Sequence, residues 1–183
     1  MALVLNGSGS ITGLSAGGLP DGSVTADDIA STLDLSGKTV TLPAGTGGKV
    51  LQVVNFTYQT EVFTTVANTP VDTGLSASIT PSSASNKILV FVSQSVSPTS
   101  SGSNGFSYVY LLRGATDIYV DQRFVGVTQY NHAVWSATYL DSPSTTSSVT
   151  YKTQIATNNS SYVIQAQHAD LRPSSITLME IAA

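Results

Sequence analysis

Residues 50–63 read Val-Leu-Gln-Val-Val-Asn-Phe-Thr-Tyr-Gln-Thr-Glu-Val-Phe, and most of them are β-branched or aromatic. Such residues are enriched in strands, where successive side chains point to opposite faces of a sheet. The stretch therefore predicts two strands or one bent strand. Further runs of this kind follow, with clusters of Ser, Pro, Gly and Asn between them, at residues 75–80, 87–95, 106–113, 117–125, 131–140, 149–157, 161–168 and 175–181.

Short strands at nearly regular spacing, with no helical pattern between them, predict an all-β fold. A parallel sheet needs long crossover connections, usually helices, and the sequence shows no pattern for them. We therefore expect an antiparallel β-sandwich of the jelly-roll type over residues 49–183.

Residues 1–48 differ in composition from the rest of the chain. They hold most of the 15 glycines, whereas every aromatic residue lies beyond residue 55. A glycine-rich segment loses much backbone entropy on ordering and has little apolar area to bury, so it cannot fold alone. We interpret it as an extended N-terminal arm that needs a surface supplied by something else.

One short helix is predicted within this arm. Thr25-Ala-Asp-Asp28 matches a capping box with a carboxylate at the N3 position. Apolar side chains at helical spacing share one face, at Ala26, Ile29, Ala30 and Leu33. Because a helix of about two turns does not persist in isolation, it either lies against the main domain or docks on a partner chain.

The charge content excludes several classes of partner. Charged residues make up 10% of the chain, and seven basic residues against 11 acidic ones give a net charge of −4. A protein with no basic surplus has little to neutralise phosphates or anionic lipids, so we expect no nucleic-acid partner. Charged residues are also depleted in the cores of subunit interfaces, which makes the low charge compatible with an oligomer.

The chain has no cysteine, which excludes disulfides, thiolate metal sites and cysteine nucleophiles. No apolar run approaches the length of a membrane-spanning helix, so we expect no membrane insertion. The first basic residue is Lys38, and no signal peptide is recognisable before it. We expect synthesis in the cytoplasm.

The remaining polar residues form no recognisable catalytic pattern. The two histidines, His132 and His168, lack the nucleophile-elbow motif that accompanies many serine-type triads. Asp117 and Asp121 are the tightest acidic pair, but on one face of a single strand they would lie about 13 Å apart at about 3.3 Å per residue. Glycosidase carboxylates lie about 5–9.5 Å apart. We therefore predict no catalytic residue, no metal site and no cofactor.

The run at residues 87–95 is apolar on both faces, because Ile88, Val90 and Val92 alternate with Leu89 and Phe91. In a two-sheet sandwich the outer face normally meets water. A second apolar face therefore predicts cover from a neighbouring subunit or from the N-terminal arm. We take as candidate subunit-interface residues Leu89, Phe91, Trp135, Tyr139 and Leu178.

Aromatic residues of the second half leave two interpretations open. Tyr119, Tyr130, Trp135 and Tyr139 lie near one another in the sequence. Tyr and Trp offer an apolar face for sugars and a polar tip, which is typical of carbohydrate-binding modules. Trp135 and Tyr139 also share one strand face, so core or subunit interface is the other interpretation.

Several stretches resemble a known class of proteins. Leu19-Pro-Asp-Gly-Ser-Val-Thr-Ala-Asp-Asp-Ile-Ala30 is similar to the linker modules of tailed-bacteriophage fibre and virion structural proteins. The later stretches resemble a phage virion domain with a C1q/TNF-like jelly roll, and they are Ser85-Asn-Lys-Ile-Leu-Val-Phe-Val-Ser93, Tyr110-Leu-Leu-Arg-Gly114, Tyr139-Leu-Asp-Ser-Pro-Ser-Thr-Thr146, Val149-Thr-Tyr-Lys152 and Ser175-Ile-Thr-Leu-Met-Glu-Ile181.

This resemblance implies a non-enzymatic virion protein that forms homotrimers about a threefold axis. The arm would attach the trimer to tail or capsid proteins, with Ala26, Ile29, Ala30 and Leu33 as candidate virion-anchoring residues. The first role is that of a short tail fibre that binds a host surface glycan or protein through loops at residues 97–104 and 141–148. The alternative role is a capsid decoration protein, of the cement or head-fibre type. A polysaccharide depolymerase is disfavoured because paired carboxylates are missing.

Overall fold

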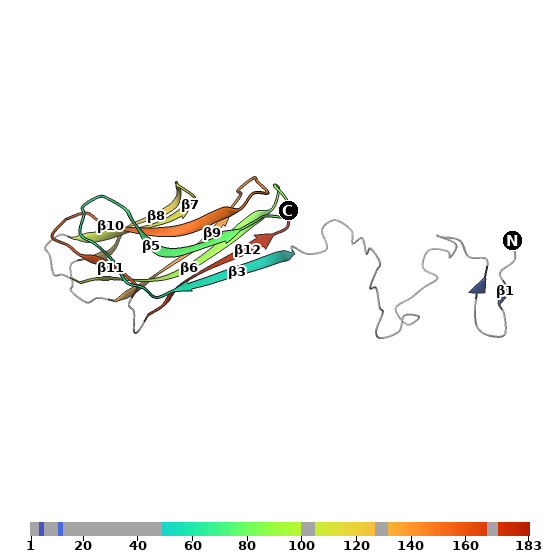
Figure 1. Cartoon of the computed structure of the whole chain (residues 1–183), viewed down its shortest axis with the longest axis horizontal. Helices are drawn as coiled ribbons and strands as arrows, with labels where there is room; N and C mark the ends of the chain where they lie inside the picture. The colour runs from blue at the N-terminus through green and yellow to red at the C-terminus, as the bar shows by residue number, and fades with distance from the viewer. Residues whose placement is uncertain (1–3, 6–10, 13–48, 100–104, 127–131, 168–171) are drawn as a thin grey trace. The chain divides into compact units, whose positions relative to one another are not determined.

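The computed structural model describes residues 4–5, 11–12, 49–99, 105–126, 132–167 and 172–183 (Figure 1). The chain divides into two units, Met1–Thr46 and Gly47–Ala183. In the first unit, β1 (Val4–Leu5) pairs antiparallel with β2 (Ile11–Thr12). The helix predicted in the arm and its candidate anchoring residues, Ala26, Ile29, Ala30 and Leu33, lie outside the described residues.

The second unit is built from strands wherever the sequence alternates. The stretch that begins the domain forms two strands, β3 (Val50–Tyr58) and β4 (Val62–Thr64). The later strands are β5 (Val71–Ile79), β6 (Lys87–Pro98), β7 (Phe106–Arg113), β8 (Thr116–Gly126), β9 (Ala133–Asp141), β10 (Val149–Thr157), β11 (Ile164–Ala166) and β12 (Ser174–Ile181).

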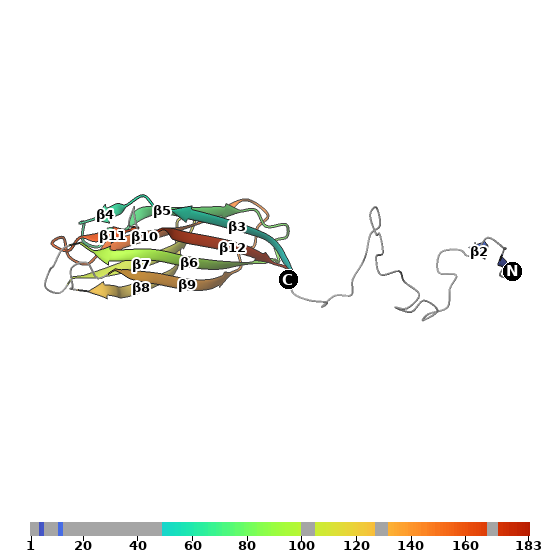
Figure 2. The same cartoon turned by 90° about the horizontal axis from the view of Figure 1, so that it is seen from below.

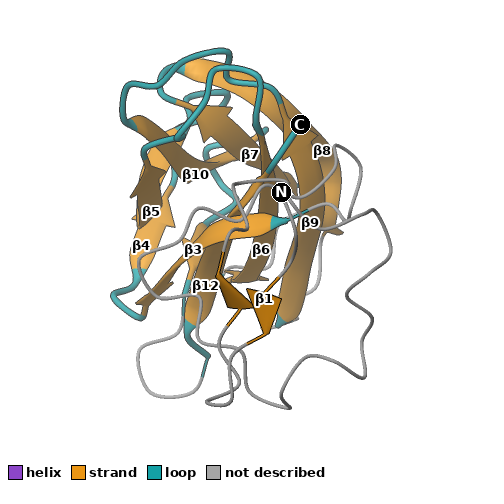
Figure 3. Cartoon of the chain, turned by 90° about the vertical axis from the view of Figure 1, so that its right-hand side faces the viewer, coloured by secondary structure: helices purple, strands orange, loops and turns teal. Residues whose placement is uncertain are grey.

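The described strands of this unit form two antiparallel sheets that lie face to face (Figure 3). One sheet has the order β5-β10-β7-β8, and the other has the order β3-β12-β6-β11-β4 with β9 on the second edge of β6. When the short strands β4 and β11 are set aside, the orders become β3-β12-β6-β9 and β5-β10-β7-β8. This interleaving is that of a jelly roll, so the predicted all-β antiparallel sandwich is confirmed.

The core lies between the two sheets and consists of the inward-pointing residues of each strand. On β6, Ile88, Val90 and Val92 point inward and are buried, as the alternation predicts. Burial of one large apolar side chain stabilises the fold by about 1.5–3 kcal/mol. The largest fully buried apolar and aromatic side chains are Trp135, Tyr151, Tyr162, Leu75, Ile79, Ile88, Leu111, Ile155, Ile164, Ile176 and Leu178.

Two of the candidate interface residues lie in this core and not on a surface. Trp135 is 1% exposed and Leu178 is fully buried, so their own chain already covers both side chains. The cause is strand parity, because Trp135 shares the inward face of β9 with Ala137, and Leu178 shares that of β12 with Ile176. Neither side chain has area left for a partner to bury.

The other three candidate interface residues keep some exposure. Tyr139 packs against the core and is half-buried, whereas Leu89 and Phe91 point outward from the six-stranded sheet. Their role in an interface stays a prediction.

The start of β3 and the end of β12 lie side by side at one end of the sandwich (Figure 1 and Figure 2). The backbone N–H of Ala182 donates a hydrogen bond to the carbonyl oxygen of Lys49 at 3.0 Å. We call this the Lys49 end. The loop at residues 141–148 follows β9 at the same end, because Asp141 pairs with Ile88 near the start of β6.

Candidate functional site

The outer face of the six-stranded sheet carries a row of apolar side chains that crosses four strands. Val53 on β3 lies opposite Met179 on β12, Met179 lies opposite Leu89 on β6, and Leu89 lies opposite Leu140 on β9. Val53 is 54% exposed and Leu140 is 50% exposed. We call Val53, Met179, Leu89 and Leu140 the apolar row.

The chemistry of this face changes along the strands. Phe91, which is 37% exposed, lies next along β6, but its cross-strand neighbours are Thr177 and Thr138. The apolar row therefore lies nearer the Lys49 end, and hydroxyl-bearing residues follow it. Soluble monomers rarely expose contiguous apolar surface of this kind, so the row marks a candidate contact surface.

The outer face of the four-stranded sheet carries aromatic rings on one strand. Phe106, Tyr108 and Tyr110 alternate on β7 with buried residues and are half-buried themselves. Their ring centroids lie 5.3 Å apart between Phe106 and Tyr108, and 6.2 Å apart between Tyr108 and Tyr110. We call these three residues the aromatic row. Their spacing of two residues within a strand run is the sequence signal for such a row, and no motif accompanies it.

Polar side chains flank the aromatic row on the neighbouring strand β10 and on β5 beyond it. Lys152 Nζ lies 2.8 Å from Asp72 Oδ1, and Gln154 Nε2 donates a hydrogen bond to the same oxygen at 2.7 Å. Burial alone would raise the pKa of Asp72, but the hydrogen bonds from Lys152 and Gln154 hold that pKa below its ordinary value. Asp72 is therefore an anion whose charge Lys152 compensates.

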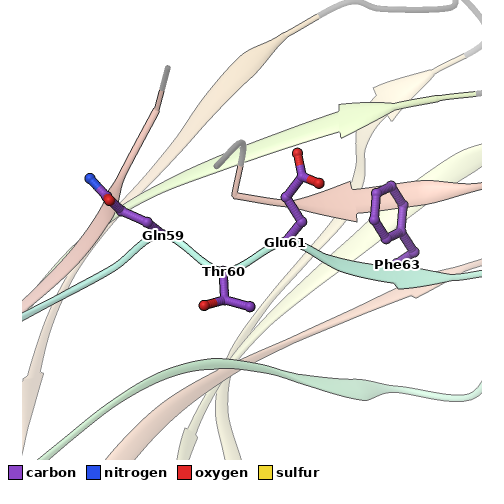
Figure 4. Close-up of a pocket in the computed structure, with 4 residues that line it drawn as sticks. All are labelled: Gln59, Thr60, Glu61 and Phe63. Carbon is purple, nitrogen blue, oxygen red and sulfur yellow. The ribbon is translucent and has the colours of Figure 1, made fainter. Parts of the chain in front are cut away.

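A surface hollow of about 490 Å³ lies where β3 leads into β4, lined by Gln59, Thr60, Glu61 and Phe63. Figure 4 shows Glu61 and Phe63 on one side of the chain and Thr60 on the other. Gln165 Nε2 donates a hydrogen bond to Glu61 Oε1 at 2.7 Å. The lining residues offer one exposed ring and one carboxylate that is already hydrogen-bonded, which is not a pair for acid–base chemistry.

A second hollow, of about 370 Å³, lies between the turn after β7 and the loop at residues 141–148. Arg113 lines this hollow. Its guanidinium group forms an ion pair with Asp141, since Arg113 Nη1 lies 2.9 Å from Asp141 Oδ1. The Tyr151 hydroxyl donates to Asp141 Oδ2 at 2.6 Å. Burial and this hydrogen bond raise the pKa of Tyr151. The three side chains join β9 of one sheet to β7 and β10 of the other, which is a structural role.

We expect Tyr151→Phe to lower the free energy of unfolding by about 1.5 kcal/mol, because a buried hydrogen bond to a carboxylate is lost. Urea denaturation measures the change. Tyr162→Phe is the matched control, since Tyr162 is equally buried and its hydroxyl makes no hydrogen bond within the described residues. Equal losses in the two variants would contradict a stabilising role for the Asp141 hydrogen bond.

The acidic pair considered from the sequence is separated by a bulge. Asp117 lies opposite Leu112, and Asp121 lies opposite Val109, with a register shift between them. One extra residue in β8 reverses the facing of the side chains, so the expectation that the pair shares a face fails. Asp121 points inward, where its Oδ2 accepts a hydrogen bond from Trp135 Nε1 at 3.2 Å.

The structure describes one of the two histidines. His132 lies just before β9 and is half-buried, and His168 is outside the described residues. Within the described ranges, no group of three or more His, Asp or Glu side chains is placed to hold a metal ion. The same part of the chain contains no helix that is long and apolar enough to span a membrane.

The two loops proposed as contact surfaces lie at opposite ends of the sandwich. The loop at residues 141–148 is at the Lys49 end. The connection at 97–104 leaves β6 near Pro98, which pairs with Ile164 at the other end. Residues 100–104 themselves lie outside the described residues. The strand ends that lead into the two loops therefore lie at opposite ends of the sandwich and do not form one surface.

No known family model matches the sequence, and no curated protein matches it. The chain is weakly similar to several solved structures. A Stig cyclase, Fisc, from Fischerella sp. TAU is 19% identical with a TM-score of 0.35, and the match covers 56% of this chain and 52% of that one. The capsid protein VP2 of infectious bursal disease virus, in a subviral particle, is 11% identical with a TM-score of 0.40, over 72% of this chain and 40% of that one.

A chain in the structure of the Gt strain of the same virus is 14% identical with a TM-score of 0.39, over 79% of this chain and 42% of that one. The chain thus spans from about two fifths to about half of the length of these structures. A weak structural similarity to viral capsid proteins is what these comparisons establish. The jelly roll itself is shown by the strand order of the two sheets.

Proposed function

We propose that this chain is a non-enzymatic structural protein of a bacteriophage virion: a homotrimeric knob, attached through residues 1–48, that acts in host adhesion like a short tail fibre. The observation that carries the proposal is the apolar row on the outer face of the six-stranded sheet. The sequence stretches that resemble tailed-phage virion proteins support the proposal that the protein belongs to a phage virion.

The apolar row favours contact between copies of the same chain. Among the outward-facing residues of β3, β12, β6 and β9 on this face, Lys87 is the one charged side chain that the structure describes. Interface cores are depleted of charge in the same way. Three copies around a threefold axis would remove Val53, Leu89, Met179 and Leu140 from water, with a gain of about 25 cal/mol for each Å² of apolar surface buried.

Light scattering on the full-length protein at micromolar concentration tests the trimer. We expect three times the chain mass of 18.9 kDa. A monomer mass would overturn the trimer.

Deletion of residues 1–48 tests the attachment. We expect the remaining domain still to assemble as a trimer, with three times the mass of the shortened chain, but to be missing from purified particles, because the arm supplies the contact with other virion proteins. Image reconstruction or antibody labelling of particles measures incorporation. Normal incorporation of the deleted chain would contradict the anchor.

The same labelling separates adhesion from decoration. Copies located at the tail would support host adhesion. Copies spread over the head would contradict adhesion and support capsid decoration. Adhesion is preferred because the structure carries a second surface of different chemistry, the aromatic row, on the sheet opposite the apolar row.

A further inference from the structure

We propose that the aromatic row binds a neutral glycan chain laid along β7, on the outer face of the four-stranded sheet. This inference deepens the proposed role in host adhesion and rests on it for its biological meaning. It assigns the ligand contact to Phe106, Tyr108 and Tyr110 and not to the loops named from the sequence.

The three rings form a platform of the kind that sugars stack on. They occupy alternate positions of one strand, so all three leave the same face, and each keeps part of its ring exposed. Centroid separations of 5.3 and 6.2 Å make the line continuous, with Phe106 edge-on to Tyr108 at an interplanar angle of 67° and Tyr108 and Tyr110 tilted by 34°, so the stacking faces are mainly those of the two tyrosines. An aromatic face attracts the C–H faces of a sugar ring, while a tyrosine hydroxyl remains at the edge for hydrogen bonds. A row of rings therefore fits a chain of sugars better than a single one.

Hydrogen-bonding groups lie beside the rings. Gln122 on β8 is opposite Tyr108, and Gln154 on β10 is opposite Tyr110. The hydroxyls of Tyr108 and Tyr110 make no hydrogen bond within the described residues, nor does the amide of Gln122. Gln154 is held in place by its bond to Asp72, which leaves its carbonyl oxygen to accept from a ligand. Amides and hydroxyls donate and accept, as sugar hydroxyl groups require.

The charged side chains that the structure describes on this face indicate an uncharged ligand. Lys152 is compensated by Asp72 and offers no free positive charge to a carboxylate or phosphate. Asp117, which is exposed and lies opposite Leu112 in the next row, adds a negative charge beyond Tyr110. Acidic polysaccharides would meet repulsion here, whereas a neutral chain would not.

A protein partner fits the face less well. Among the side chains of β8 and β10 that the structure describes around the rings, the exposed apolar one is Val120, and its neighbours are the polar groups just described. The apolar row on the other sheet has the aliphatic composition that subunit contacts use. The outer face of the six-stranded sheet would therefore contact other copies of the chain, and the outer face of the four-stranded sheet would bind the sugar chain.

The test titrates full-length protein with three neutral hexasaccharides, cellohexaose, maltohexaose and mannohexaose, and with hexagalacturonate as the acidic probe. Isothermal titration calorimetry gives the affinities. We expect saturable binding of at least one neutral hexasaccharide and weaker binding of hexagalacturonate. Tyr108→Ala and Tyr110→Ala should each weaken the affinity about tenfold or more, because a stacking surface is lost, while Tyr108→Phe should keep most of it.

Phe63→Ala is the matched control, because it removes an exposed ring from the hollow between β3 and β4. Its affinity should equal that of the wild type. The inference is overturned if no neutral hexasaccharide binds, if hexagalacturonate binds better, or if the Tyr→Ala variants bind as the wild type does. A changed oligomer mass in those variants would make the row a protein contact. A monomeric wild type that still binds sugar would overturn the trimer and keep the glycan surface.

Discussion

Replacing Leu89 with aspartate is expected to dissociate the trimer into monomers, with a fall in mass to one third. Leu89 lies at the middle of the apolar row, between Met179 and Leu140. In a trimer the new carboxylate would be buried among apolar side chains without a cation, which costs several kcal/mol. In the monomer the same carboxylate points outward into water, so the jelly roll itself should remain folded.

Light scattering measures the mass, and near-ultraviolet circular dichroism confirms that the fold is kept. Ser78→Asp is the control, because it places the same charge on the outer face of the other sheet, at an exposed position. This variant should remain a trimer. A Leu89→Asp protein that keeps the trimer mass would show that the apolar row is not the subunit contact.

Glu180→Gln is expected to lower the free energy of unfolding by about 3 kcal/mol. The Glu180 side chain is fully buried. Its carboxylate accepts hydrogen bonds from Gln52 Nε2 and Asn86 Nδ2 at 2.6 Å, and from the backbone N–H and the hydroxyl of Ser82 at 2.7 Å. An amide keeps one accepting oxygen but turns an NH2 donor toward the other donors, so either the bond that ties β12 to β3 or the bonds to the loop before β6 would be lost.

The same site makes stability depend on pH. Burial alone would raise the pKa of Glu180, but the hydrogen bonds from Asn86, Gln52 and Ser82 lower it from the ordinary 4.5 to about 2. The unfolded chain therefore binds the proton at a higher pH than the folded one does. The stabilisation is complete above pH 4.5 and is lost as the pH falls toward 2.

Urea denaturation at pH 7 and pH 3 measures both effects. The wild type should lose stability between these pH values by more than Glu180→Gln does, because the variant lacks the titrating group. Asp117→Asn is the control, since Asp117 is exposed and its replacement should change stability at pH 7 by less than about 0.5 kcal/mol. Parallel losses in wild type and Glu180→Gln would contradict the role of this carboxylate.

The alternation of residues was sufficient to predict the strands, because β-branched and aromatic runs recur between turn residues. It could not say which alternating set faces the core. On β9 the set with Trp135 turned inward and the set with Leu140 turned outward, although both contain apolar residues. Burial of the larger aromatic area is favoured, which places Trp135 in the core, one of the two positions that the sequence left open for it besides ligand binding.

Two features of the surfaces depend on pairing that no single stretch reveals. The apolar row exists because Val53, Met179, Leu89 and Leu140 fall in register across four strands that are distant in sequence. The bulge in β8 that separates Asp117 from Asp121 is likewise a property of its pairing with β7. Glu180 did carry a local signal, since it shares the inward parity of Ile176 and Leu178, and a charge there predicts a hydrogen-bonded carboxylate.

The pairing of β3 with β12 has a mechanical consequence. β3 is an edge strand whose hydrogen bonds run to β12, from Tyr58 opposite Ser174 to Val50 opposite Ile181. Antiparallel hydrogen bonds lie perpendicular to the strands. A pull on the backbone at Lys49 along the strand direction therefore loads all of these bonds in shear at once and does not peel them one by one. The domain would therefore resist tension applied at Lys49 best along this axis.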